Sequence, residues 1–387
     1  MCPLPSAAMP SPVVSVVVTN HNYGRFLAEC LESALAQTHE AVEIVVVDDA
    51  STDDSAEVLR AFGSRVRVLF ETCGGQAGAA NAGFAASTGD VVIFLDADDV
   101  LLPSAAARAA AVLATPDAVK VHWPVETMDV SGRLLDGRLP LEPLPAGDLR
   151  AHLLEVGPGA VSFPPTSGNA WTRAFLSRVM PIPVDRYRFG LDTYLAGLAP
   201  LYGLVDADGV CHSRYRLHPA SNWSALSFRD RLDLDSAQDE VTRASLAEHC
   251  RLLGITCDPD RWQETSWFRR LSLAVDEVEP FVRGRTVAIV DEDQWGVDES
   301  VGWSARPFPE RDGVYWGPPA TDADALAELA RPLPRLRQRV AHAVPAPAVD
   351  RPRAGLRPHA LGPEEIAGDF RQLIPRELPS CADLPRM

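Results

Sequence analysis

The stretch that decides the fold is VVIFLDADD, residues 91–99, in which an apolar strand runs directly into the carboxylates of Asp96, Asp98 and Asp99. A buried strand does not end in that much negative charge without a counter-charge. A divalent metal ion bridging the carboxylates to a diphosphate would supply one, because Mg²⁺ and Mn²⁺ prefer hard oxygen ligands. An aspartate-x-aspartate triplet also fits a solvated turn, so its position in the chain has to decide between the two.

Three similar apolar runs precede this strand and alternate with segments of helical periodicity. The pattern predicts strands at Val13–Val18, Val42–Val47, Val66–Phe70 and Val91–Leu95. Between the first two, apolar side chains recur at helical spacing, at Phe26, Leu27, Cys30, Leu31, Ala34 and Leu35. A second helix is predicted to begin near Thr52 with Ser51 as its N-cap, and a third spans about Gln76–Ser87.

Three consecutive strand, helix and strand units predict an α/β fold with a doubly wound, right-handed, mainly parallel sheet flanked by helices. In such sheets ligands bind beyond the carboxyl ends of the strands. The loops at those ends are polar, at Thr19–Asn22, Asp48–Asp49, Cys73–Gln76 and Asp96–Asp99. A binding site is therefore expected where these loops meet, although each cluster alone is also consistent with a helix cap or a turn.

The later part of the chain is less regular. Its pattern predicts a strand at Val119–Trp123, a helix near Thr172–Val179, mostly helical structure over residues 231–278 and a strand at Thr286–Val290. A loop segment follows, up to Gly317-Pro318-Pro319. Beyond Pro332 the sequence is rich in proline, arginine and alanine, which predicts a flexible or loosely attached tail rather than a packed core.

Composition limits the classes of partner. The 387 residues, 46% of them hydrophobic, can fill a substantial core, and the net charge of -17 repels phosphate backbones, so no nucleic-acid partner is expected. Seven cysteines lack a CxxC pair or framework spacing and are interpreted as reduced thiols. The N-terminus does not resemble a signal peptide, and no run of about 18 apolar residues predicts a transmembrane segment. We therefore expect a cytoplasmic protein.

Four motifs follow one another in a specific order and spacing: VVVTNHNY at 16–23, VVVDDASTD at 45–53, NAG at 81–83 and FLDADD at 94–99. In this order they resemble the signature of the family-two inverting glycosyltransferases, whose nucleotide-binding fold is called GT-A. The resemblance covers about residues 13–115. It implies a GT-A sheet followed by a mostly helical C-terminal extension.

The resemblance also implies a set of nucleotide-binding residues: Thr19, Asn20, Asn22, Tyr23, Asp48, Asp49, Gly75, Gln76, Asn81, Asp96, Ala97 and Asp98. Among them, Thr19, Asn22 and the Asp48/Asp49 pair would hold the base and ribose, since carboxylates accept hydrogen bonds from base N–H groups and ribose hydroxyls. A glycine such as Gly75 permits close backbone approach. Asp98 would bind a Mn or Mg ion, which acts as a Lewis acid toward the departing diphosphate.

Two later blocks, TSGNAW at 166–171 and GLDTYL at 190–195, resemble the acceptor-side blocks of the same family. They imply acceptor or sugar contacts at Gly168, Asn169, Trp171 and Asp99. An inverting displacement needs a base for the acceptor proton, and the matching residue is Asp192. Many relatives have two adjacent acidic residues here, whereas this chain has Leu191 before Asp192. The alternative is that Asp192 is a helix N-cap.

The segment YRLHPASNW, residues 215–223, resembles a late family element that folds back over the diphosphate. Its histidine, His218, is implied as a second metal ligand or a phosphate contact, beside the alternative of a histidine in a surface loop. Four aromatic side chains could stack on sugar rings, although core packing explains most of them better: Trp171, Trp223, Tyr187 and Tyr194.

The resemblance thus implies a metal-dependent glycosyltransferase that moves a sugar, with inversion, from a nucleoside-diphosphate sugar to a hydroxyl or amine of a glycan, lipid-linked or small-molecule acceptor. It divides the chain into a nucleotide-sugar-binding half at 1–115, an acceptor-binding half at 116–230, a helical or mixed extension at 231–330 and a tail at 331–387. One alternative is a sugar-nucleotide pyrophosphorylase, which needs a Gly-rich basic loop where this chain has Thr19–Asn22. The other is a non-catalytic nucleotide-sugar-binding module.

Overall fold

The computed structural model describes residues 11–71, 74–218 and 228–284, with short pieces at 286–289, 304–307, 310–311, 314–315, 321, 327 and 340–341. The chain divides into two compact units. The first contains residues 1–226 and 230–272, and the second contains residues 227–229 and 273–387. The functional assignment of residues 1–115 and 116–230 to two halves of one domain stays a prediction.

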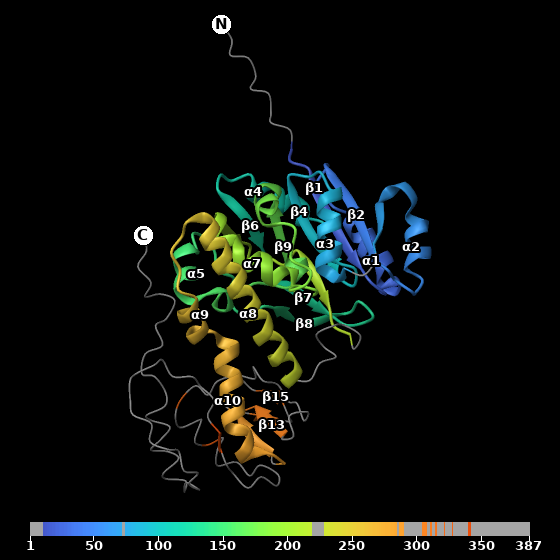
Figure 1. Ribbon diagram of the computed structural model, residues 1–387. Helices are drawn as coiled ribbons and strands as arrows, with labels where there is room; N and C mark the ends of the chain where they lie inside the picture. Colours follow the sequence, from blue (N-terminus) through green and yellow to red (C-terminus); the bar gives the residue numbers. More distant parts are fainter. Residues whose placement is uncertain are drawn as a thin grey trace. The chain divides into compact units, whose positions relative to one another are not determined.

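A seven-stranded sheet forms the centre of the first unit, in the order β10-β6-β9-β4-β1-β2-β3 (Figure 1). Its strands are β1 (Val14–Asn20), β2 (Val42–Asp49), β3 (Arg67–Glu71), β4 (Val91–Asp96), β6 (Ala118–His122), β9 (Asn169–Thr172) and β10 (Leu204–Ala207). Strands β1 to β4 are parallel to one another, and β9 runs antiparallel between β4 and β6. The predicted α/β class with a doubly wound, mainly parallel sheet is confirmed.

Helices cover both faces of this sheet because its strands are apolar on both sides. Alternate residues of β4 enter opposite cores: Ile93 and Leu95 pack into one, Val92 and Phe94 into the other. The first core is closed by α1 (Gly24–Leu35), α2 (Ser55–Phe62) and α4 (Ala105–Leu113). The second is closed by α3 (Gly75–Ala86), α5 (Arg150–Val156), α6 (Arg173–Val179), α7 (Leu191–Tyr202), α8 (Phe228–Leu253) and α9 (Pro259–Thr265). Short 3-10 turns lie at Gly63–Arg65, Pro158–Ala160 and Thr166–Gly168.

A second, four-stranded sheet in this unit has the order β5-β11-β7-β8. Its strands are β5 (Val100–Leu101), β7 (Val125–Met128), β8 (Leu134–Leu139) and β11 (Ser213–Arg216). Strand β5 directly follows the DADD loop, and Arg214 of β11 pairs with Val100 of β5. This pairing brings residues 213–218 back against the end of β4, far earlier in the chain.

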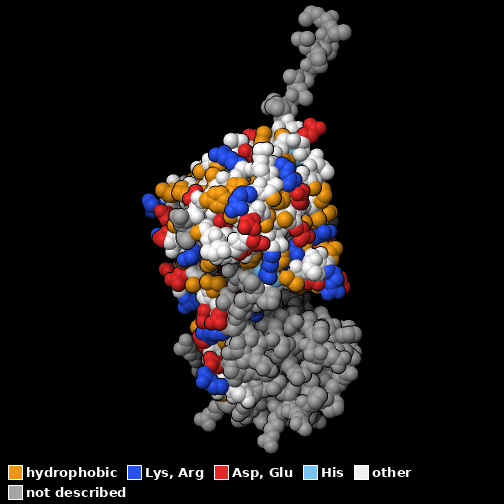
Figure 2. Space-filling view, turned by 90° about the vertical axis from the view of Figure 1, so that its right-hand side faces the viewer, with side chains coloured by type: hydrophobic (Ala, Val, Ile, Leu, Met, Phe, Trp, Pro, Cys, Tyr) orange, Lys and Arg blue, Asp and Glu red, His pale blue; other side chains and the backbone are white. Residues whose placement is uncertain are grey.

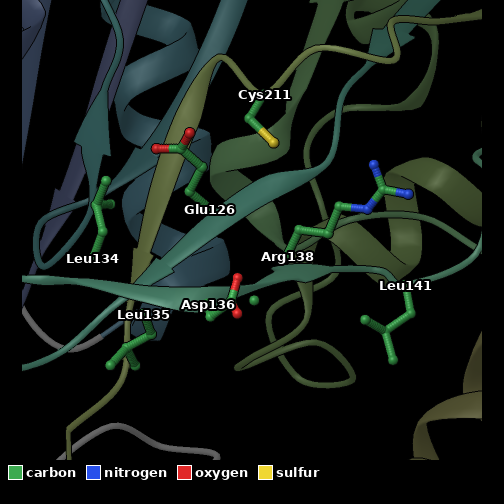
Figure 3. A pocket seen from close by; sticks show the side chains of 8 residues that line it. Glu126, Leu134, Leu135, Asp136, Arg138, Leu141 and Cys211 are labelled. Carbon is green, nitrogen blue, oxygen red and sulfur yellow. The ribbon is translucent and has the colours of Figure 1, made fainter. Parts of the chain in front are cut away.

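A pocket of about 470 Å³ lies on the four-stranded sheet (Figure 3). It is lined by Glu126, Leu134, Leu135, Asp136, Gly137, Arg138, Leu141 and Cys211. The predicted site residues are not among these, so the pocket and the predicted site involve different side chains.

The second helix differs from its prediction. It begins at Ser55 rather than Thr52, and Ser51 makes no cap. The hydroxyl of Ser51 instead accepts the backbone N–H of Asn22 at 2.9 Å, because residues 50–54 fold as a separate loop. A carboxylate oxygen of Asp53 accepts the N–H of Ser55 at 3.0 Å, so Asp53 satisfies the start of the helix.

The second unit contains the end of α10 (Trp267–Val282) and short strands. Strand β12 (Thr286–Ile289) was predicted, and it pairs in parallel with β13 (Ser304–Pro307) and β16 (Val340–Ala341). Strands β14 (Glu310–Arg311) and β15 (Val314–Tyr315) form an antiparallel pair. The loop expected before Gly317 therefore contains strands. Apart from β16, the predicted tail beyond Pro332 lies outside the described residues.

On the part of the face seen in Figure 2 that carries colour, acidic and basic side chains are interspersed. Among the described residues, no helix has both the length and the apolar character needed to cross a membrane. The described cysteines are free thiols, at Cys30, Cys211, Cys250 and Cys257.

Candidate active site

The polar ends of β4, β1 and β2 lie side by side, as the topology predicted. Thr19 is aligned with Asp96, and Asn20 with Asp48. The hydroxyl of Thr19 donates to Asp96 Oδ1 at 3.1 Å, and Asn20 Nδ2 donates to Asp48 Oδ2 at 2.7 Å. The strand alignment therefore builds one polar edge from motifs that lie far apart in the sequence.

Asn22 ties the loop after β1 to the loop after β2. It adopts a left-handed backbone conformation with φ of 60°, and its Oδ1 accepts the N–H of Thr52 at 2.7 Å. Asparagine tolerates this conformation better than most residues. The next residue, Tyr23, packs edge-on against His218, with ring centroids 5.5 Å apart. The first motif thus fixes two loops of the site through backbone contacts.

Asp49 organises the start of α3. Its two carboxylate oxygens accept the backbone N–H groups of Gly74 and Gly75 at 2.9 and 2.8 Å. Gly75 has φ of +64°, and a Cβ there would lie 2.6 Å from the carbonyl oxygen of Arg188. A glycine is therefore required where the loop before α7 approaches α3.

Gln76 connects the donor-side edge to the start of α7. Its Nε2 donates to Asp96 Oδ1 at 2.8 Å, while its Oε1 accepts the backbone N–H of Gly190 at 3.2 Å. Both ends of the amide are therefore used to hold β4, α3 and α7 in a fixed arrangement.

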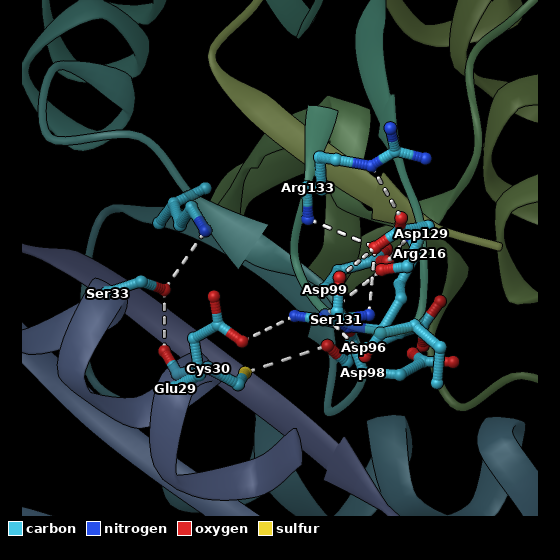
Figure 4. A network of polar contacts seen from close by, with 12 residues as sticks. Glu29, Cys30, Ser33, Asp96, Asp98, Asp99, Asp129, Ser131, Arg133 and Arg216 are labelled. Carbon is cyan, nitrogen blue, oxygen red and sulfur yellow. Dashed lines mark hydrogen bonds and ion pairs between the residues drawn. The ribbon is translucent and has the colours of Figure 1, made fainter. Parts of the chain in front are cut away.

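The three carboxylates of the DADD loop have three different surroundings (Figure 4). Burial, with the neighbouring charges of Asp98 and Asp192, raises the pKa of Asp96 to about 7. Asp98 faces His218, with Asp98 Oδ2 3.0 Å from His218 Nε2. Asp99 is only 1% exposed and accepts hydrogen bonds from Ser167 Oγ at 2.6 Å and from the backbone N–H of Arg216 at 3.0 Å.

His218 is buried rather than part of a surface loop. Its ring lies 5.5 Å from that of Tyr23 and 5.0 Å from that of Phe26, measured between centroids. Asp98 and His218 offer an oxygen and a nitrogen side by side, which suits Mn or Mg. Among the described residues, no three His, Cys, Asp or Glu side chains form a complete metal site. This pair would therefore fit an ion whose other ligands come from a bound phosphate.

Arg216 was not predicted as a site residue, yet it holds the DADD loop. Its side chain is buried, and Nε donates to the carbonyl oxygen of Asp98 at 2.8 Å. Its Nη2 pairs with Glu29 Oε2 at 2.6 Å, and its guanidinium lies 4.7 Å from the ring centre of Phe26. Only its position two residues before His218 hinted at this role in the sequence.

Asp192 lies in the first turn of α7. The N-cap of this helix is Gly190, with φ of 88°, so the alternative of Asp192 as N-cap is wrong. Burial raises the pKa of Asp192, while the backbone N–H of Thr193, which donates to its Oδ1 at 2.8 Å, the charge of Lys120 and a hydrogen bond from Thr166 act in the opposite direction. The charge of Asp192 also contributes to raising the pKa of Asp96, after burial and the charge of Asp98.

Several predicted contact residues also have a role in the fold. Asn81 uses both ends of its amide on the backbone of Ile182, at 2.9 and 2.7 Å. Four residues predicted for the acceptor or sugar are buried, and so is one predicted for the nucleotide: Gly168, Asn169, Trp171, Asp99 and Ala97. Since Asp48, at the polar edge of the sheet, is buried as well, the assignment of these residues stays a prediction.

Comparison with known proteins gives the family. Residues 15–155 match the model of glycosyl transferase family 2. An uncharacterized glycosyltransferase of Nostoc sp. strain PCC 7120, alr2836, is 38% identical over 310 residues, which cover 77% of this chain and 91% of that protein. This chain belongs to glycosyl transferase family 2. The α/β fold of this family-two glycosyltransferase is of the GT-A type, and its reaction class is glycosyl transfer.

Other similarities are more partial. Glycosyltransferase GlyG of Streptococcus pneumoniae is 44% identical over 95 residues, which cover 24% of this family-two glycosyltransferase and 32% of GlyG. The structure of residues 1–349 of S. aureus TarS in complex with UDP aligns with a TM-score of 0.47 at 17% identity, over 70% of this chain and 75% of that one. Asp192 and His218 lie beyond the range of the family match, which ends at residue 155.

Proposed function

We propose that this family-two glycosyltransferase moves a sugar from a nucleoside-diphosphate sugar to an acceptor hydroxyl or amine in a single inverting displacement, with the help of Mn or Mg. The observation that carries the proposal is the amide of Gln76, which joins Asp96, at the end of β4, to the backbone N–H of Gly190, two residues before Asp192 at the start of α7. This contact supports a site formed by a carboxylate from the acceptor-side block and the carboxylates of the DADD loop.

The donor would bind at the edge built by β4, β1 and β2. Asp48 presents a buried carboxylate that Asn20 and the backbone N–H of Ser51 already orient. A carboxylate held in this way is ready to accept hydrogen bonds from a base N–H or a ribose hydroxyl. Thr19 and Gln76 orient Asp96 in the same manner, so the nucleotide would meet preorganised acceptors.

Asp98 and His218 would hold the divalent cation. With only two protein ligands, the ion would complete its shell with diphosphate oxygens, as Mg²⁺ sites commonly do. A bound cation supplies Lewis-acid stabilisation of the charge that develops on the departing diphosphate. Arg216 and the rings of Tyr23 and Phe26 would keep the two ligands in place.

Asp192 would act as the base. The acceptor O–H or N–H proton passes to its carboxylate while the acceptor atom bonds to the anomeric carbon. The bond from that carbon to the diphosphate oxygen breaks, and a nucleoside diphosphate leaves. Because burial raises the pKa of Asp192, its carboxylate is a stronger proton acceptor than an exposed aspartate.

The test compares Asp192→Asn with Asp185→Asn, an aspartate whose side chain is 78% exposed. With UDP- or GDP-sugars and MnCl₂, release of the nucleoside diphosphate should fall on the order of 10²- to 10⁴-fold in Asp192→Asn and stay unchanged in Asp185→Asn. The rise in melting temperature on adding UDP or GDP with Mn should survive in both. Full activity of Asp192→Asn, or retention of anomeric configuration in the product, contradicts the proposal.

A further inference from the structure

Lys120 is unusual in both sequence and structure. The 36 basic residues of the chain comprise 35 arginines and this single lysine. It lies in the middle of β6, between Val119 and Val121, and is only 2% exposed. Lysine is almost never fully buried unless it is paired. The one lysine among the basic residues of this chain is therefore buried in a strand, an environment that disfavours a charged side chain.

The described side chains nearest to the ammonium of Lys120 are aromatic rings rather than hydrogen-bond acceptors. Its Nζ lies 5.1 Å from the ring centre of Trp171, which is its cross-strand neighbour, and 5.7 Å from that of Phe163. Among the described residues, no hydrogen bond to its ammonium is found. Burial lowers the pKa of Lys120 to about 7, and Asp192 is the charge that opposes this shift.

Helix α7, which carries Asp192, packs against β6, which carries Lys120. Burial raises the pKa of Asp192, and the charge of Lys120 opposes this shift together with the backbone N–H of Thr193, which donates to Asp192 Oδ1 at 2.8 Å. The charge of Asp192 also contributes to raising the pKa of Asp96 on β4 and of Tyr215 on β11. Burial, with the charge of Lys120, lowers the pKa of His122 on the same strand, which keeps that imidazole neutral. Among the described residues, Lys120 is the cation whose charge acts on Asp192.

We propose that Lys120 is a positioning residue for the base: its ammonium, buried on β6, against which helix α7 packs, keeps the Asp192 carboxylate ionised and ready to take the acceptor proton. This inference rests on the proposed role of Asp192 as base. It assigns to Trp171 and Phe163 the task of holding the ammonium, through the attraction between a cation and an aromatic face.

The choice of lysine supports this role. An arginine here would bring a larger, always charged guanidinium with five N–H donors to satisfy, whereas an ammonium is compact and responds to its partner. A buried unpaired charge also lowers stability, so replacing it by an apolar group of similar length should be neutral or stabilising. A residue that the fold would be better without is a candidate for function.

The single lysine makes a direct test possible. Protein labelled with [13Cε]lysine gives one lysine resonance, whose shift against pH reports the titration of Lys120. We expect its pKa to fall by about one unit or more in Asp192→Asn, because a nearby opposite charge favours the charged form. In the control Asp185→Asn it should not move. An unchanged titration in Asp192→Asn overturns the proposal, whatever the activity of that variant.

The second arm measures kcat/KM for nucleoside-diphosphate release against pH in Lys120→Met. Loss of the ammonium should move the acidic limb of the profile to higher pH by about one pH unit. On that limb kcat/KM should therefore fall on the order of tenfold, and at higher pH the difference from the parent should become smaller. The melting temperature should not fall. Lys120→Arg, if equally stable, should restore the limb. An unmoved limb, or a uniform loss with a lower melting temperature, refutes the role of Lys120 in positioning the base.

The outcomes separate this inference from the proposed function. If Asp192→Asn keeps full transfer activity, the assignment of the base fails. Suppose instead that Asp192→Asn is inactive, that its lysine titration is unchanged, and that the acidic limb of Lys120→Met is also unchanged. In that case only the role of Lys120 fails.

Discussion

The DADD loop after β4 and the first turn of α7 reach the same site in different ways. In the loop, carboxylates adjacent in sequence diverge: Asp98 faces His218, while Asp99 is turned inward to Ser167 and Arg216. At α7 a single carboxylate, Asp192, is buried, and the charge of Lys120 on strand β6 is among the groups that oppose the rise of its pKa. The loop is specified by a short motif, whereas the helix start is specified by packing across the sheet. The two regions should therefore respond differently to substitution.

The strongest contrast is between Asp98 and an aspartate of no assigned function. Asp98→Ala should lower nucleoside-diphosphate release on the order of 10³-fold, since the cation contributes several kcal/mol to stabilising the leaving group. Asp136→Ala, at an exposed position on β8, should change nothing. Electron paramagnetic resonance of Mn²⁺ should show binding that requires UDP or GDP and disappears in Asp98→Ala. Unchanged Mn²⁺ binding in that variant would contradict the division of roles within the loop.

Substitution of the neighbouring residue, Asp99, should lower the stability of the protein. Asp99→Ala removes, in a buried place, the acceptor of the Ser167 hydroxyl and of the N–H of Arg216, although Ser167 Oγ still accepts the N–H of Asp96 at 3.3 Å. At 1–3 kcal/mol for each unsatisfied group, the free energy of unfolding should fall by about 3 kcal/mol. Asp99→Asn keeps an oxygen acceptor and the volume, so urea denaturation should show a smaller loss. If Asp99→Ala is as stable as the parent, the inward half of the loop does not support the fold.

The difference between the regions also explains which features the sequence could predict. Apolar runs of valine and isoleucine located β1 to β4, and parallel pairing then required Thr19, Asp48 and Asp96 to meet. Whether a given side chain points toward the ligand or into the core depends on packing. Trp171 was proposed for the sugar and lies under Lys120 in the core.

Long-range partners left weaker traces in the sequence. Nothing in the spacing of Arg216 shows that it would bond to the carbonyl of Asp98, because β11 joins the loop only through its pairing with β5. Lys120 did carry a signal, as the only lysine of the chain and flanked by valines. Its meaning depends on the position of Asp192, which the fold alone supplies.

Gly75 lies where α3 meets the loop before α7, so its substitution should affect both the stability of the fold and the binding of the donor. In Gly75→Ala the left-handed conformation costs about 1 kcal/mol, and the Cβ would also clash with the carbonyl of Arg188. Gly254→Ala is the control, since Gly254 also has a positive φ, of +69°, and open space around it. Only Gly75→Ala should also raise KM for the donor, because Gln76 would lose its alignment with Asp96 and Gly190. Equal KM values in both variants would argue against that link.

The smallest expected effect concerns Asp235, a carboxylate outside the candidate active site. It tests whether a raised pKa there has any influence on catalysis. Burial raises the pKa of Asp235 on α8 to about 7, despite the opposing charge of Arg231. Its unfolded value is about 3.9, so between these values the folded state binds the extra proton. This contribution to stability is therefore present at low pH and is lost as pH rises through about 7.

Asp235→Asn should remove that dependence while leaving the catalytic pH profile unchanged. At pH 8 its melting temperature should exceed that of the parent by about 2–4 °C, with little difference at pH 5. Glu240→Gln, at an exposed position on the same helix, should show no such change. Asp96, Asp99 and Asp192 also make the melting temperature depend on pH, but equally in the parent and in both variants. The test therefore compares the melting temperature of each variant with that of the parent at the same pH. A shifted acidic limb in Asp235→Asn would mean that burial anywhere in the first unit, rather than the pairing of Asp192 with Lys120, sets the catalytic pH dependence.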